Sequence, residues 1–68
     1  MTIELNGEPL ELAGPATIST AIARSGVDAD RRGIAVAVDG EVVPRSAWDE
    51  TELSDGQRVE VVGAIQGG

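Results

Sequence analysis

Two turn dipeptides, Asn6-Gly7 and Asp39-Gly40, constrain the fold of this chain most strongly. Both central residues of a type I′ turn need positive φ, which Gly adopts freely and Asn or Asp tolerate, so these pairs favour two-residue β-hairpin turns. Each pair separates two runs rich in Leu, Ile or Val, at residues 2–12 and 34–43. The sequence therefore predicts two β-hairpins.

The register of the first hairpin follows from its two-residue turn. Leu5 is predicted to face Glu8, and Ile3 to face Leu10. The side of the hairpin that faces the core then carries Ile3, Leu5, Leu10 and Leu12. Pro9 has no N–H to donate to a neighbouring strand, so we expect the second strand at an edge of the sheet.

The second hairpin places Val36 opposite Val43 and Ala37 opposite Val42. Residues 34–38 are apolar without alternation, a pattern typical of a strand that is covered on both faces. We therefore expect this strand to be buried on both sides.

A short helix is predicted between the hairpins. Thr17 suits the N-cap, and Gly26 suits the left-handed position after the last turn. The stripe expected to pack on the first hairpin consists of Ile18, Ala21 and Ile22. Residues 28–33 form a charged connection, which we interpret as a solvated loop rather than as a metal site built from Asp28 and Asp30.

The segment from 44 to 57 has no regular periodicity, and Trp48 and Leu53 are its apolar residues of largest size. We interpret both as packing anchors, and Trp48 as an anchor rather than a recognition residue. The acidic residues of this segment are Asp49, Glu50, Glu52 and Asp55. We interpret these residues as charges on a solvated loop. The alternative is that they steer a basic partner electrostatically.

A last strand is predicted over residues 58–65. Val59, Val61 and Ile65 share one face, whereas the other face carries Arg58, Glu60, Val62 and Ala64. That second face changes from charged to apolar toward the end of the chain. Exposed apolar side chains favour a binding surface, so we expect Val62, Ala64 and Ile65 to contact a partner protein.

The chain ends in Gln66-Gly67-Gly68. Two residues without Cβ make a thin segment that fits a narrow channel, and three residues extend by about 10 Å. We expect 1–65 to form the folded domain and 66–68 a flexible tail. In this hypothesis Gly67 and Gln66 present the Gly68 carboxylate to a foreign active site, and a frayed terminus is the alternative.

Composition limits what the side chains contribute. At 68 residues the chain is one domain with no room for a deep cleft, and it has no Cys and no His. We therefore expect a protein that is not an enzyme, with no catalytic residue, bound metal or bound cofactor. A net charge of −7 disfavours nucleic acid and anionic membrane as partners, so a protein partner is expected. The start lacks a signal peptide and no long apolar run follows, which favours the cytoplasm. We also expect a monomer.

One helix covers one face of a sheet, so these elements predict an α+β fold. The chain resembles the ThiS family of thiamine-biosynthesis sulfur carriers, which are ubiquitin-like β-grasp domains. The resemblance lies in residues 6–8, 33–38, 40–46, Trp48, Leu53, 55–56, 58–60 and 64–68. Asp39 stands where the family more often has Asn, which preserves the turn. The resemblance implies a mixed sheet whose last strand runs centrally beside the first, with one short helix packed on one face.

The resemblance also implies a reaction sequence at Gly68. An E1-like adenylyltransferase of the ThiF type would use ATP and Mg²⁺ to convert the Gly68 carboxylate into a glycyl adenylate. Sulfur derived from a cysteine desulfurase would then give a thiocarboxylate, a terminal 1-thioglycine. Thiazole synthase, of the ThiG type, would take that sulfur to build the thiazole of thiamine. The sulfur is thus carried covalently at Gly68.

Three other functions remain open at this point. The sulfur carrier of molybdopterin synthesis is also a β-grasp protein with a Gly-Gly end. A passive binding module would use the apolar sheet face alone. A ubiquitin-like tag would be conjugated to lysines of other proteins.

Overall fold

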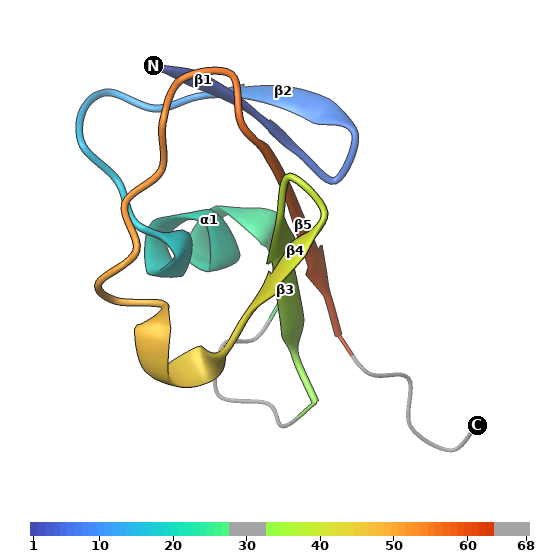
Figure 1. Cartoon of the computed structure of the whole chain (residues 1–68). Helices are drawn as coiled ribbons and strands as arrows, with labels where there is room; N and C mark the ends of the chain where they lie inside the picture. The colour runs from blue at the N-terminus through green and yellow to red at the C-terminus, as the bar shows by residue number, and fades with distance from the viewer. Residues whose placement is uncertain (28–32, 64–68) are drawn as a thin grey trace.

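The computed structural model describes residues 1–27 and 33–63. Its elements in chain order are β1 Thr2–Leu5, β2 Glu8–Glu11, α1 Ile18–Ser25, β3 Ala35–Val38, β4 Glu41–Val43, a 3₁₀ helix η1 at Arg45–Ala47, and β5 Arg58–Val62. The five strands form one mixed sheet in the order β2-β1-β5-β3-β4. Helix α1 lies across one face of that sheet (Figure 1). The predicted α+β fold is confirmed.

The first hairpin has the predicted turn and register. Asn6 and Gly7 have φ values of 51° and 87°, as a type I′ turn requires. Ile3 pairs with Leu10, and Leu5 with Glu8. Strand β2 lies at the edge of the sheet, which confirms the expectation drawn from its proline.

The second hairpin confirms the predicted pairs but corrects one expectation. Val36 lies opposite Val43 and Ala37 opposite Val42, joined by a turn with positive φ at both central residues. However, β3 is covered on one face only, because Val36 is buried whereas Ala35 is exposed. Helix α1 covers one face of the sheet, and the small alanine side chains leave little apolar area on the open face.

Helix α1 begins and ends as predicted. Thr17 has the extended backbone of an N-cap, and its N–H donates to Thr20 Oγ1 at 3.3 Å. Gly26 ends the helix in the left-handed region, with φ 86°. Ile18, Ala21 and Ile22 are all at most 1% exposed, so the predicted stripe is in the core.

The irregular segment after β4 closes the core beneath α1. The buried ring of Trp48 donates its indole N–H to the Val43 carbonyl at 2.9 Å, and Leu53 N–H donates to the Ala16 carbonyl at 2.8 Å. Both residues are packing anchors, as predicted. The acidic residues Asp49, Glu50, Glu52 and Asp55 are exposed. The connection predicted over 28–33 falls mostly on residues 28–32, outside the described part of the chain.

Strand β5 is the centre of the sheet, parallel to β1 and antiparallel to β3. Val59 and Val61 are buried, whereas Arg58, Glu60 and Val62 are exposed, which confirms the predicted alternation. The strand ends at Val62; the predicted continuation through Ala64 and Ile65 lies outside the described residues.

Candidate functional site

The candidate site is the open face of the sheet at the end of β5. Of the predicted site residues, the structure describes Val62, whose side chain is 59% exposed on that face. Gly68, Gly67, Gln66, Ile65 and Ala64 lie outside the described residues. The described part of the site is therefore the surface that precedes the predicted tail.

Four small apolar residues from three strands form a continuous patch on this face. Val62 lies opposite Ala35, and Ala37 lies opposite Val42. Ala35 and Ala37 are two residues apart on β3, so both pairs share one face. We call Val62, Ala35, Ala37 and Val42 the open-face patch.

Val42 is the functional candidate that sequence reasoning missed. It is 72% exposed, and it and Val62 are the large hydrophobic residues exposed within 1–27 and 33–63. The predicted register already placed Val42 opposite Ala37, which was the available signal. The interpretation of β3 as covered on both faces concealed it.

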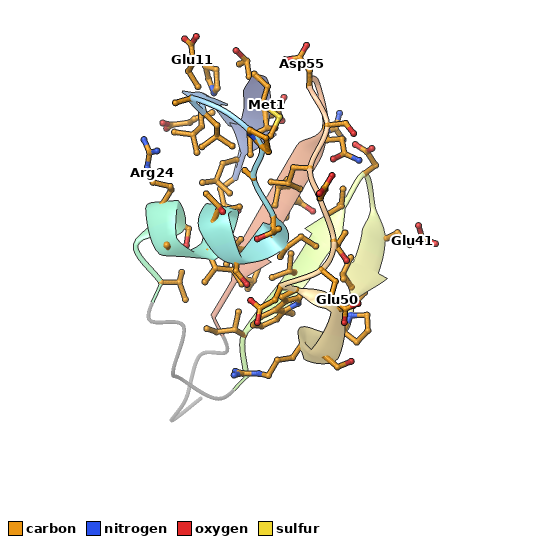
Figure 2. All side chains as sticks on the ribbon, turned by 90° about the vertical axis from the view of Figure 1, so that its left-hand side faces the viewer. Met1, Glu11, Arg24, Glu41, Glu50 and Asp55 are labelled. Carbon is orange, nitrogen blue, oxygen red and sulfur yellow. The ribbon has the colours of Figure 1, made fainter. Side chains whose placement is uncertain are left out.

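Charged side chains share the open face with the patch. Glu60 lies opposite Ala37 in the β3–β5 pair, on the same face as the patch. Farther along that face, Arg58 Nε lies 3.6 Å from Glu4 Oε2, an exposed ion pair. Figure 2 views the opposite, helix-covered side of the molecule, where Glu11, Glu41, Glu50 and Asp55 are distributed over the strands and the irregular segment. A partner with an apolar centre and a basic rim would complement this surface.

Two turn residues hold β5 from opposite edges. Asn6 N–H donates to the Val59 carbonyl at 2.9 Å, and Asn6 Oδ1 accepts from Val61 N–H at 2.8 Å. On the other side, Asp39 N–H donates to the Arg58 carbonyl at 2.8 Å, and Asp39 Oδ1 accepts from Arg58 N–H at 3.0 Å. The Asn6 side chain thus contacts β5 toward the end where the chain leaves the sheet, and Asp39 contacts β5 at its start.

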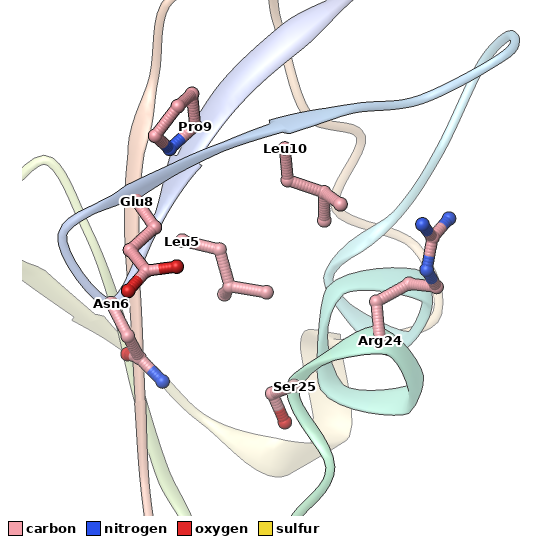
Figure 3. Close-up of a pocket in the computed structure, with 7 residues that line it drawn as sticks. All are labelled: Leu5, Asn6, Glu8, Pro9, Leu10, Arg24 and Ser25. Atoms are coloured by element: carbon pink, nitrogen blue, oxygen red, sulfur yellow. The ribbon is translucent and has the colours of Figure 1, made fainter.

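A separate hollow of about 290 Å³ lies on the helix side of the sheet. The end of the first hairpin and the last turn of α1 line it, with Leu5 and Leu10 beside Glu8 and Arg24 (Figure 3). Within the described residues, no group of three or more Asp or Glu side chains is placed to hold a metal ion. The lining of the hollow therefore combines apolar and charged side chains.

Similarity to known proteins extends over nearly the whole chain. The sequence profile of the ThiS family matches residues 3–68, nearly the whole chain. The chain belongs to the ThiS family. The match includes the open-face patch and the final Gly67-Gly68 pair.

Solved structures of similar proteins share the fold of this ThiS-family chain. It is 30% identical to the thiamine biosynthesis protein ThiS from Geobacter metallireducens, whose crystal structure matches with a TM-score of 0.77 over the whole of both chains. A solution NMR structure of a thiamine biosynthesis protein from the same organism matches with a TM-score of 0.79 at 28% identity, over all of this chain and 88% of that one. The predicted ubiquitin-like β-grasp fold is confirmed.

A curated relative of different length also matches. The chain is 32% identical over its 68 residues to a thiazole synthase of Paramagnetospirillum magneticum. The alignment covers 20% of that protein, so this ThiS-family chain spans about a fifth of the length of its curated relative. Within the described residues, no helix is long and apolar enough to cross a membrane.

Proposed function

We propose that this chain is a sulfur carrier of thiamine biosynthesis, and that the Gly68 carboxylate is its reacting group. The observation that carries the proposal is the ThiS-family match, which runs through the open-face patch to Gly67 and Gly68. In this role the chain is a protein substrate rather than a catalyst. The proposed use of ATP by its activating enzyme favours the cytoplasm.

The chemistry at Gly68 requires one substitution at the α-phosphorus of ATP and a second at the Gly68 carbonyl carbon. An ionised carboxylate is a poor acyl donor, so it would first attack the α-phosphorus of Mg²⁺-bound ATP, forming a glycyl adenylate and releasing pyrophosphate. A cysteine desulfurase supplies sulfur as a persulfide, and a thiol, oxidised to a disulfide, would provide the two electrons that bring this sulfur to the sulfide level. The sulfur would form a C–S bond with Gly68 as the C–O bond to AMP breaks. The product is a thiocarboxylate, whose sulfur is a stronger nucleophile than the oxygen it replaces.

The described residues support docking rather than catalysis. Val62 exposes apolar area at the end of β5, Val42 adds exposed apolar area on β4, and Glu60 adds negative charge. We propose that the open-face patch, together with Ala64 and Ile65, docks onto the activating enzyme and later onto thiazole synthase. Gln66 and Gly67 would then lead Gly68 into the active site.

The curated relative supports thiazole synthase as the acceptor enzyme. A stretch similar to this whole chain makes up 20% of a protein named thiazole synthase. Joining two interacting parts in one chain raises their effective concentration, so such an arrangement is expected where a carrier and its acceptor work together. The activating enzyme of the ThiF type and the desulfurase are inferred from the carrier chemistry.

The proposal is tested by incubating the chain with ATP, Mg²⁺, a ThiF-type adenylyltransferase and sulfide, followed by intact-mass measurement. We expect a mass gain corresponding to the exchange of one oxygen for sulfur at Gly68, which omission of ATP prevents. Transfer to thiazole synthase, rather than to molybdopterin synthase, separates the thiamine carrier from the molybdopterin carrier. An unchanged mass beside an active reference carrier contradicts the proposal and favours a passive binding module, whereas conjugates with other proteins would indicate a tag.

A further inference from the structure

We propose that Asn6 is a positioning residue that sets the direction in which β5 leaves the sheet, and thereby where the residues after Gly63 are presented. The inference rests on the proposed function, because its kinetic consequence requires Gly68 to react in a foreign active site. The inference assigns a role to Asn6, which lies 55 positions before Val61, the residue that it contacts.

The contact compensates for the early end of β1. The last pair between β1 and β5 is Leu5 with Val59, after which the chain turns away at Asn6. Val61 N–H, two residues farther along β5, would then have no strand partner on that edge. The Asn6 carboxamide supplies the acceptor at 2.8 Å, so β5 is held on both edges for one further step.

The position needs both the backbone and the side chain of asparagine. Asn6 has φ 51°, a left-handed conformation that Asn, Asp and Gly adopt most readily. Gly would preserve the turn but remove the acceptor, whereas Asp would preserve both. Substitution at Asn6 can therefore separate the contact with Val61 from the shape of the hairpin.

The chain contains a matched control at the opposite end of the strand. Asp39 also begins a hairpin turn, with φ 52°, and also accepts from a β5 N–H through its side chain, here that of Arg58. This contact lies at the start of β5, away from Gly63. Asp39→Gly therefore removes an equivalent hydrogen bond without releasing the outgoing end.

The experiment compares the intact chain with Asn6→Gly, Asn6→Asp and Asp39→Gly. Amide exchange at Val61 and ¹⁵N relaxation at Gly63 are measured on the free protein, and kcat and KM are measured with the adenylyltransferase. In Asn6→Gly we expect Val61 exchange to be about fivefold faster, the effect of one lost hydrogen bond, and Gly63 to be more mobile. We expect kcat to fall about tenfold through misplacement of the reacting group, with KM nearly unchanged because the open-face patch is intact.

The inference is supported if kcat falls in Asn6→Gly alone. Asn6→Asp and Asp39→Gly should then keep the kcat of the original chain. Equal losses of kcat in Asn6→Gly and Asp39→Gly, or failure of Asn6→Asp to restore it, overturn it. If the unaltered chain is not activated at all, the proposed function fails. The role of Asn6 in positioning the end of β5 is then tested by amide exchange at Val61 and ¹⁵N relaxation at Gly63. If both are unchanged in Asn6→Gly, that role is rejected.

Discussion

Val62 of β5 and Ala35 of β3 lie directly opposite each other on the face of the sheet that α1 leaves uncovered. Neither side chain contributes to the buried core, because Val62 is 59% exposed and Ala35 is also exposed. A valine beside an alanine at the end of the central strand is therefore available for contact with another protein.

Val62→Glu should weaken binding to the adenylyltransferase and to thiazole synthase. Burying a carboxylate in an apolar contact is unfavourable, so we expect a loss of about tenfold or more in affinity. The melting temperature should change by no more than about 3 °C, because the site is exposed. Titration calorimetry and thermal unfolding measure the two effects, with Ala23→Glu on the exposed side of α1 as the matched control. Equal binding by Val62→Glu and the original chain would refute the docking role.

Charge reversal at Glu60 should slow association more than the same change at Glu50. Glu60 shares the face of the open-face patch, whereas Glu50 follows η1 in the irregular segment. Charges near a docking surface affect the association rate most, and salt screens them with a Debye length of about 8 Å at physiological ionic strength. Stopped-flow association at several salt concentrations compares Glu60→Lys with Glu50→Lys. If both variants slow association equally, the net charge of the chain, rather than the position of Glu60, determines the association rate.

Deletion of Gly68, or Gly67→Val, should prevent formation of the thiocarboxylate while leaving the fold intact. Each buried hydrophobic residue in the described part of the chain lies between Ile3 and Val61, so the core does not depend on the changed positions. Intact mass after incubation with the activating enzyme measures the reaction, and far-UV circular dichroism checks the fold. A variant without Gly68 that still acquires sulfur would exclude the assigned reacting group.

Gly40→Ala and Gly14→Ala should change stability in opposite directions. Gly40 has φ 86°, where a Cβ is strained, so alanine there should lower the free energy of unfolding by about 1 kcal/mol or more. Gly14 lies outside this positive-φ range and an added Cβ meets nothing within 4 Å, so alanine should stabilise by about 0.4 to 1 kcal/mol through the unfolded chain. Urea unfolding of both variants tests the assignment of the second hairpin turn.

Val59→Ala tests the central position of β5. Val59 is 0% exposed at the level of the pair with Leu5, so the substitution removes two buried methyl groups and leaves a cavity. We expect the free energy of unfolding to fall by about 2 kcal/mol. Ala substitution at the exposed Val62 should cost much less, and comparable losses would contradict the assigned burial.

Local chemistry was sufficient to predict most of the fold. A type I′ turn allows few residue types and fixes the pairing register on both sides, so Asn6-Gly7 and Asp39-Gly40 determined which side chains face each other. The cap residues Thr17 and Gly26 likewise set the limits of α1. These signals lie within a few residues of the structure that they specify.

Local patterns did not predict features that depend on distant segments, and the central place of β5 beside β1 was expected from the family resemblance instead. Alanines in β3 gave an apolar run, but whether a second layer covers them depends on the other elements of the fold. In the described part of the chain, α1 covers the opposite face of the sheet. The contact between Asn6 and Val61 joins segments 55 residues apart, and no local pattern specifies a side-chain acceptor at that distance. The roles of residues 64–68 stay predictions.

The sole aromatic residue of the chain, Trp48, is buried at 6% exposure, and the Arg45 guanidinium carbon lies 5.0 Å from the ring centroid. It packs in the core, on the side of the sheet away from the open-face patch. Its fluorescence is therefore a native optical signal for unfolding that does not require a label. A partner bound over Val62 should leave the Trp48 emission nearly unchanged. Folding and complex formation can therefore be followed independently in one sample.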